Sequence, residues 1–103
     1  MATDFEKKVY KKLKNIPGGR VVSYGGLAKA CGRPGAARAV GNALNRNPFA
    51  PVVPCHRVVC SNGLVGGYAH GIEKKIELLR KEGVEVDEKG RVKDFGNKVI
   101  CNW

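Results

Sequence analysis

The chain has 103 residues, the size of a single domain, and its hydrophobic fraction of 43% is ordinary for a globular protein. Nineteen Lys and Arg residues against nine Asp and Glu residues give a formal net charge of +10, which favours a polyanionic partner, nucleic acid first. No apolar run approaches membrane-spanning length, and no signal-peptide pattern begins the chain. We therefore expect an intracellular protein with no membrane partner and with its cysteines kept as thiols.

The positive charge is concentrated in one half of the sequence. No acidic residue lies between Lys7 and Arg57, and the acidic residues lie before and after that span. The basic residues of the span are Lys7, Lys8, Lys11, Lys12, Lys14, Arg20, Lys29, Arg33, Arg38, Arg46 and Arg57. This distribution predicts a basic face rather than an evenly charged surface.

The first predicted element is a helix over residues 4–15. Thr3 and Glu6 have the spacing of a capping box, in which each side chain binds the other residue's backbone N–H. Apolar residues then recur near helical spacing, at Phe5, Val9, Leu13 and Ile16. The Pro-Gly-Gly run at positions 17–19 ends the helix.

A short extended piece at residues 21–22 precedes two short predicted helices. Ser23 is a good N-cap for a helix over residues 24–31, and Pro34 suits the first position of a helix over residues 35–44. Small residues dominate the second helix and allow another backbone to approach closely. Two short helices joined by a glycine-containing turn on a basic background indicate a helix-turn-helix, and they fit a plain helical hairpin equally well.

Residues 47–71 hold the most reactive pattern. Prolines at positions 48 and 51 predict irregular chain, while valine pairs at positions 52–53 and 58–59 predict short strands around Pro54-Cys55-His56-Arg57. Cys55 beside His56 pairs a potential nucleophile with a potential base, although a cysteine in an apolar strand is often only a core residue. A zinc site from Cys55, His56, Cys60 and His70 is conceivable. Because that spacing fits no standard ligand pattern, we expect no metal.

The remaining elements are a turn, a loop, a helix and a hairpin. Residues 61–63 predict a turn, and the glycine-rich residues 66–71 predict either a wall for a flat ligand or a flexible loop. A helix is expected over residues 72–82, with Gly83 ending it. Its inward-facing side chains are expected to be Ile72, Ile76 and Leu79. Alternating valines then predict a hairpin that turns at residues 87–90. The apolar residues of the tail are expected to dock on the core or help to bind a partner: Phe95, Val99, Ile100 and Trp103.

With these residues laid out, the chain resembles the DNA-binding, catalytic domain of the O6-alkylguanine-DNA alkyltransferase family. The resemblance runs from Phe5 to Gly83 and rests on motifs in the family's order: Ser23-Tyr24, Ala36-Ala37-Arg38-Ala39-Val40-Gly41, Asn47-Pro48, Pro54-Cys55-His56-Arg57-Val58, Gly66 and Tyr68. It implies a mainly α fold with short strands, organised as a winged helix-turn-helix-like domain. The single domain 1–103 then divides into a helix-turn-helix (23–45), an active-site segment (47–71), a C-terminal helix (72–83) and a tail (84–103). Most members carry an additional N-terminal domain, which we expect to be absent here.

The resemblance also implies a function. The family transfers an alkyl group from O6-alkylguanine in duplex DNA, and less well from O4-alkylthymine, to its own cysteine after base flipping. The transfer is irreversible and stoichiometric and uses no cofactor. Cys55 would be the acceptor, His56 would take the thiol proton through a water, and Glu82 would orient His56. We expect a monomer that binds double-stranded DNA with the second helix of the pair in the minor groove.

Further roles follow from the same resemblance. Tyr24 matches the tyrosine that rotates the target nucleotide, Arg38 the arginine that fills the gap in the stack, and Asn47 the asparagine that ties the helix-turn-helix to the active-site segment. Additional DNA contacts are expected at Gly25, Arg33 and Ser61. The substrate pocket is expected to use Tyr24, Val58, Tyr68 and Ala69, the last through its backbone N–H. His70 is expected to narrow that pocket.

Two other classes of protein compete with this interpretation. Alkyltransferase-like proteins share the fold and bind lesions without chemistry, but they replace the cysteine, so the presence of Cys55 argues against that class. A regulatory helix-turn-helix protein with an incidental cysteine is the other alternative. A cysteine hydrolase is a weaker hypothesis, because no polar group that would orient the histidine follows at a known spacing.

Overall fold

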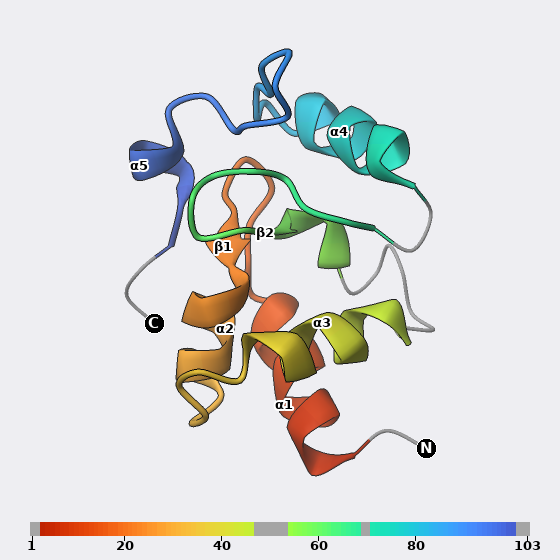
Figure 1. Cartoon of the computed structure of the whole chain (residues 1–103), viewed down its shortest axis with the longest axis vertical. Coiled ribbons are helices and arrows are strands. Elements are labelled where there is room, and N and C mark those ends of the chain that lie inside the picture. The colour runs from red at the N-terminus through yellow and green to blue at the C-terminus, as the bar shows by residue number, and fades with distance from the viewer. Residues whose placement is uncertain (1–2, 47–53, 69–70, 101–103) are drawn as a thin grey trace.

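The computed structural model describes residues 3–46, 54–68 and 71–100. The helices and strands of these residues follow in the order α1 (Asp4–Leu13), β1 (Val22–Ser23), α2 (Tyr24–Ala30), α3 (Ala37–Asn45), the 3-10 helix η1 (Cys55–Arg57), β2 (Val58–Val59), α4 (Ile72–Lys81) and α5 (Phe95–Lys98). Figure 1 shows α1, α2 and α3 gathered at one end, α4 and α5 at the other, and the strands between them. The fold is therefore mainly α with short strands, as predicted. No helix of the described residues is long and apolar enough to cross a membrane.

Helix α1 begins at the predicted capping box. The Glu6 backbone N–H donates to Thr3 Oγ1 at 3.1 Å, and the Thr3 backbone N–H donates to Glu6 Oε1 at 2.9 Å. Val9 and Leu13 are fully buried one turn apart, which fixes the face that α1 turns toward the core. The Tyr10 hydroxyl donates to the Ala43 carbonyl at 2.7 Å and ties α1 to the end of α3.

Helices α2 and α3 form the predicted helix pair, but α3 begins later than expected. The Ser23 hydroxyl accepts from the Gly26 N–H at 2.9 Å, which confirms it as the N-cap of α2. Pro34 does not open the second helix, because Gly35 has a φ of +86°, a left-handed conformation that interrupts helical geometry. Helix α3 starts at Ala37 and has no side-chain N-cap, so residues 31–36 form a longer turn than predicted.

The two strands form a parallel pair that divides the core. Val22 pairs with Val58 and Ser23 with Val59. Successive side chains of a strand point to opposite faces, so Val22 and Val58 pack with α1, α2 and α3, whereas Val21 and Val59 pack with Leu79 of α4 and the valines beyond it. In this parallel register Tyr24, which follows β1, is level with Cys60, which follows β2, whereas η1 with Cys55 precedes β2. The valine pair predicted as a strand at positions 52–53 lies outside the described residues.

Helix α4 ends as predicted but turns a different face inward. The backbone N–H groups of Gly83 and Val84 donate to the carbonyls of Arg80 and Leu79, and Gly83 has a φ of +86°, which is a Schellman C-cap. Ile72 was expected to face inward, yet it is 48% exposed. Lys75 is fully buried instead, because its ammonium donates a hydrogen bond to the Gly67 carbonyl.

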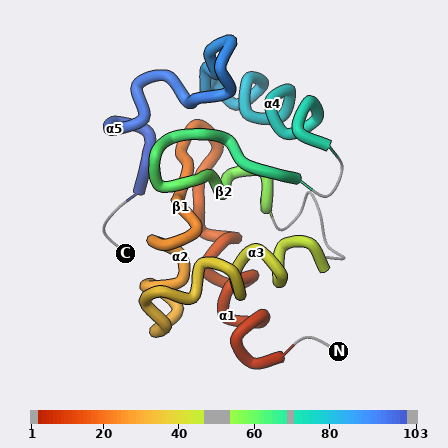
Figure 2. Tube along the Cα trace, in the orientation of Figure 1, coloured from red at the N-terminus to blue at the C-terminus, as the bar shows by residue number. Residues whose placement is uncertain are grey.

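The tail packs back against the strands. The predicted hairpin is present, with Val86 bridged to Val92. Helix α5 follows, and Val99 then forms a parallel bridge with Val21. The Ile100 N–H donates to the Val21 carbonyl at 2.8 Å. Figure 2 traces this return of the chain from α4 to the side of β1. The tail therefore pairs with Val21, the residue before β1, and Phe95, Val99 and Ile100 dock on the core, which is one of the two roles expected for them. Trp103 lies outside the described residues.

Candidate active site and DNA-binding surface

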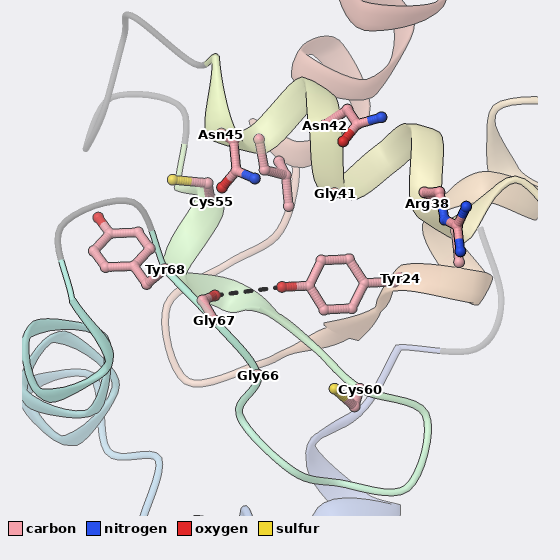
Figure 3. A pocket seen from close by; sticks show the side chains of 12 residues that line it. Tyr24, Arg38, Gly41, Asn42, Asn45, Cys55, Cys60, Gly66, Gly67 and Tyr68 are labelled. Atoms are coloured by element: carbon pink, nitrogen blue, oxygen red, sulfur yellow. Dashed lines mark hydrogen bonds between the residues drawn. The ribbon is translucent and has the colours of Figure 1, made fainter.

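Cys55 lies at the start of η1, on the wall of a cavity of about 700 Å³. Its side chain is mostly buried, with 4% of the residue exposed. The cavity is lined by Tyr24, Ala37, Arg38, Gly41, Asn42, Leu44, Asn45, Cys55, Cys60, Gly66, Gly67 and Tyr68. Helix α3 forms one side of the cavity and the loop carrying Gly66 and Tyr68 forms another (Figure 3). The thiol is thus positioned at the edge of the core rather than sealed within it.

His56 and Arg57 converge on one carboxylate. Glu82, the C-cap of α4, accepts from His56 Nε2 at 3.1 Å and from Arg57 Nε at 2.9 Å, and its second oxygen pairs with Arg57 Nη2. Burial of Glu82 acts to raise its pKa, but the hydrogen bonds from Arg57 and the charge and hydrogen bond of His56 outweigh burial and hold the pKa below its usual value. The carboxylate therefore stays ionised and fixes the imidazole that follows Cys55.

The environment of His56 sets its tautomer and charge. Burial, together with the charges of Arg57 and Lys75, lowers the pKa of His56 although the Glu82 carboxylate acts to raise it, so the imidazole is neutral near pH 7. A neutral imidazole that donates from Nε2 to the carboxylate carries its lone pair on Nδ1. His56 Nδ1 is buried and has no hydrogen-bond partner in the described parts of the chain. Cys55 is thus followed by a histidine whose free nitrogen is ready to accept a proton.

Two tyrosines reach the cavity from different elements. Tyr24, the first residue of α2, directs its hydroxyl to the Gly67 carbonyl at 3.4 Å (Figure 3). Burial, followed by the charge of and a hydrogen bond with Cys55, raises the pKa of Tyr68 to about 12. Burial also raises the pKa of Tyr24, with the nearby cysteines adding to the effect. Both phenols therefore stay protonated near neutral pH and keep their ability to donate hydrogen bonds.

Gly66 lets the loop approach Tyr24 closely. Its φ is +72°, and a Cβ at this position would lie 3.2 Å from Cys60 Sγ and 3.4 Å from the Tyr24 ring. Gly67 is different, because a Cβ there would meet nothing within 4 Å. The glycine-rich loop is thus a wall of the cavity, which is one of the two alternatives left open by the sequence.

The structure brings some predicted site residues together and leaves others apart. Tyr24, Arg38, Cys55 and Tyr68 line the same cavity, with Arg38 exposed near the start of α3. Gly25 is exposed in the first turn of α2, where it directly follows Tyr24. The Val58 side chain is fully buried in the core, so only its backbone is available to a substrate. Asn47, Ala69 and His70 lie outside the described residues.

Arg33 and Ser61 do not line the cavity of Cys55. Arg33 is exposed in the turn between α2 and α3, and its guanidinium lies over the Phe5 ring at 4.9 Å from the ring centre. Ser61 is exposed in the predicted turn after β2. Both residues are exposed to solvent outside the cavity, and only Arg33 belongs to the basic span between Lys7 and Arg57.

Lys75 contacts two residues of the cavity and was not among the site residues expected from the sequence. Its Nζ donates to the Gly67 carbonyl at 3.1 Å and lies 5.7 Å from the centre of the Tyr24 ring. Burial lowers its pKa to about 8, although Cys60 and Cys55 act to raise it. Only its spacing four residues before Leu79 places it on the inward face, and a lysine at such a position is ordinarily assigned to the surface. Cys60, which also lines the cavity, was considered only as a metal ligand.

No group of three or more His, Cys, Asp or Glu side chains that would hold a metal ion occurs among the residues that the structure describes. The zinc set weighed from the sequence includes His70, which is outside those residues.

The chain is similar to proteins of one family. The family model described as "6-O-methylguanine DNA methyltransferase, DNA binding domain" matches residues 4–84. A Shigella flexneri protein named "Methylated-DNA--protein-cysteine methyltransferase" is 56% identical over 81 residues, which cover 79% of this chain and 47% of the relative. A protein of the same name from Methanosarcina acetivorans is 53% identical over 81 residues, covering 79% of this chain and 52% of the relative.

Two solved structures show the same similarity. Mycobacterium tuberculosis OGT in complex with DNA has a TM-score of 0.78 and 49% identity, covering 81% of this chain and 51% of that one. S. pombe Atl1, in complex with damaged DNA containing O6-carboxymethylguanine, has a TM-score of 0.81 and 33% identity, and the match covers 97% of this chain and 98% of that one. The chain spans about half the length of the curated relatives it matches. On the match of residues 4–84, it belongs to the 6-O-methylguanine DNA methyltransferase family through that family's DNA-binding domain.

Proposed function

We propose that this chain repairs DNA by transferring an alkyl group from O6 of guanine to Sγ of Cys55. The observation that carries the proposal is the shared cavity of Cys55, Tyr24 and Arg38, in which a thiol meets residues of the helix pair. An O6-alkyl carbon inside a stacked duplex is out of reach, so the base must be extruded, at a cost of about a few kcal/mol. The relatives' names, which speak of methylated DNA and a protein cysteine, support the same chemistry.

The transfer is a displacement at the alkyl carbon. The Cys55 thiol loses its proton to His56 Nδ1, directly or through one water, and the resulting thiolate attacks the carbon. The S–C bond forms as the C–O6 bond breaks, and the electron pair of the broken bond leaves with the guanine oxygen. The proton held by His56 balances the charge left on guanine. Glu82 supports this role because it favours the tautomer with Nδ1 unprotonated.

The cavity walls have roles in binding the extruded base. The Tyr24 hydroxyl can donate to the oxygen on which negative charge develops once it exchanges the Gly67 carbonyl for the base. Arg38 is exposed at the rim, and its planar cation suits the space left in the base stack. Lys75 and Tyr24 both donate to the Gly67 carbonyl, which supports a positioning role for Lys75 in holding the loop beside the base. Asn47 and Ala69 are proposed as further members of the site on sequence resemblance alone.

The partner is double-stranded DNA, and one chain acts on one lesion. The basic half of the sequence and the DNA-bound states of the OGT and Atl1 structures support this partner. A thiol nucleophile fits a reducing compartment, where DNA is also found. We infer a monomer, which sedimentation of the protein with and without DNA would test.

A second candidate function is lesion binding without transfer. The similarity to Atl1 over 97% of this chain favours it. The two functions are separated by following O6-methylguanine in a duplex during incubation with wild type, Cys55→Ala and Cys60→Ala. Repair predicts one lesion lost per chain with wild type and Cys60→Ala and none with Cys55→Ala. Retention of the lesion by wild type, with equal lesion affinity in Cys55→Ala, would establish the binding function instead.

A further inference from the structure

A second cavity, of about 460 Å³, lies between α1 and α2 and is strongly basic. One wall carries Lys8, Lys11 and Lys12 of α1 together with Asn15, and the other carries residues 30–32 at the end of α2. None of its lining residues is acidic, and none of them also lines the cavity of Cys55. Three positive charges therefore surround a hollow that the proposed transfer does not use.

The grouping of these lysines is not balanced within the protein. Their spacing places them on one face of α1, where like charges one turn apart destabilise a helix. None of the ion pairs found among the described residues includes Lys8, Lys11 or Lys12. The buried acid of α1, Glu6, is already engaged by Thr3 and Arg46. A bound anion would relieve the repulsion between the three ammonium groups.

The floor of the cavity adds no opposing charge. Cys31 is 5% exposed, and burial raises the pKa of its thiol, so it stays neutral. Lys8 and Lys12 line this cavity together with Cys31, and their charges act on the pKa of its thiol in the opposite direction to burial.

Helix α2 connects the two cavities. Tyr24 at its beginning lines the cavity of Cys55, and Ala30 at its end lines the basic cavity. Seven residues at 1.5 Å each span about 10 Å, or about three base pairs of duplex at 3.4 Å each. A duplex that runs along α2 with its damaged base in the first cavity then has backbone phosphates within reach of the second.

We propose that the basic cavity between α1 and α2 binds backbone phosphates of the DNA flanking the lesion, in a contact separate from the cavity of Cys55. This inference rests on the proposed function for the identity of the duplex. The phosphodiester is the chemistry that fits, because three mobile ammonium groups and an amide offer donors without any acidic competitor.

The test is the salt dependence of DNA affinity in the triple variant K8Q/K11Q/K12Q. Glutamine preserves helix propensity and removes only the charge. If each lysine neutralises one phosphate, the slope of log K against log salt becomes shallower by about 2.7, so the wild type loses about 40-fold more affinity than the variant between 50 and 200 mM salt. Fluorescence anisotropy with a duplex containing O6-methylguanine measures both slopes.

A matched control is K74Q/K81Q/K89Q, which removes the same amount of charge from α4 and the hairpin beyond it. The inference predicts that this control keeps the wild-type slope. Equal slopes in the two triple variants, or an unchanged slope in K8Q/K11Q/K12Q with only a lower melting temperature, would overturn it and leave the lysines as partners of the α2 C-terminus. Alkyl transfer at saturating DNA should stay at the wild-type rate in both variants. Failure of transfer in the wild type would instead contradict the proposed function.

Discussion

Replacing Lys75 with Met tests the buried lysine, whose charge is costly to bury. Met fills the space of the lysine stem and removes the ammonium that donates to the Gly67 carbonyl. The fall in the pKa of Lys75 from 10.5 to about 8 corresponds to about 3 kcal/mol of unfavourable interaction of the charged form, at about 1.4 kcal/mol per pH unit. This is a large share of the about 5–15 kcal/mol that stabilises a typical domain.

The sign of the pH effect follows from proton binding. Below about pH 8 the lysine is protonated in both the folded and the unfolded chain, and the full cost of burying the charge is present. Between about pH 8 and 10.5 only the unfolded chain holds the proton, so the stability of the wild type rises with pH relative to a variant without the lysine. The gain over this window approaches about 3 kcal/mol.

Urea unfolding of wild type and Lys75→Met at intervals from pH 7 to 10.5 measures this difference. Lys74→Met is the control, since Lys74 is exposed and pairs with Glu77. We expect the wild-type and Lys74→Met curves to stay parallel, while Lys75→Met loses its advantage as pH rises. Parallel curves for wild type and Lys75→Met would refute the burial of the charged lysine. Alkyl transfer by Lys75→Met should also slow, because the loop at Gly67 loses its tether.

Three further predictions concern the residues around Cys55. Glu82→Gln should slow transfer by at least about 10-fold, because His56 loses the carboxylate that orients it. The same variant should lower the free energy of unfolding by about 2 kcal/mol in a urea titration, because Arg57 loses its anionic partner. Transfer by Glu82→Gln at the wild-type rate would contradict a role for Glu82 in the site. Gly66→Ala should cost about 1–3 kcal/mol, because a φ of +72° and the 3.2 Å approach to Cys60 Sγ both oppose a Cβ, whereas Gly67→Ala should melt near the wild-type temperature. Because the pKa of His56 is lowered, the transfer rate should hold as pH falls through 6.5 and decline only at lower pH; a decline centred above pH 6.5 would contradict the buried neutral imidazole.

The features that were predictable from the sequence are those set by local chemistry. The capping box of Thr3 and Glu6, the cap at Ser23 and the stop at Gly83 each depend on residues within one or two helical turns. The adjacency of Cys55 and His56 is likewise a property of the chain itself. The position of Glu82 beside His56, 26 residues away, was expected only from the family resemblance and is present in the structure.

The features that were missed depend on tertiary contacts. Pro34 suits a helix start, but the left-handed Gly35 delays α3, and nothing in the local pattern decides between the two. Lys75 is buried because its Nζ donates to the Gly67 carbonyl and lies against the Tyr24 ring, and both of these residues belong to other segments of the chain. The bridge of Val99 to Val21 joins segments nearly eighty residues apart, so no short window of sequence contains it.

The most direct measurement is peptide mapping by mass spectrometry after the protein has reacted with a duplex that contains O6-methylguanine. Cys55 and Cys60 line the same cavity, so the position of the methyl group separates a specific acceptor from general thiol reactivity. We predict one methyl group per chain, located on Cys55. A methyl group on Cys60, an even distribution over the cysteines, or an unmodified protein together with an intact lesion would contradict the proposed role of Cys55.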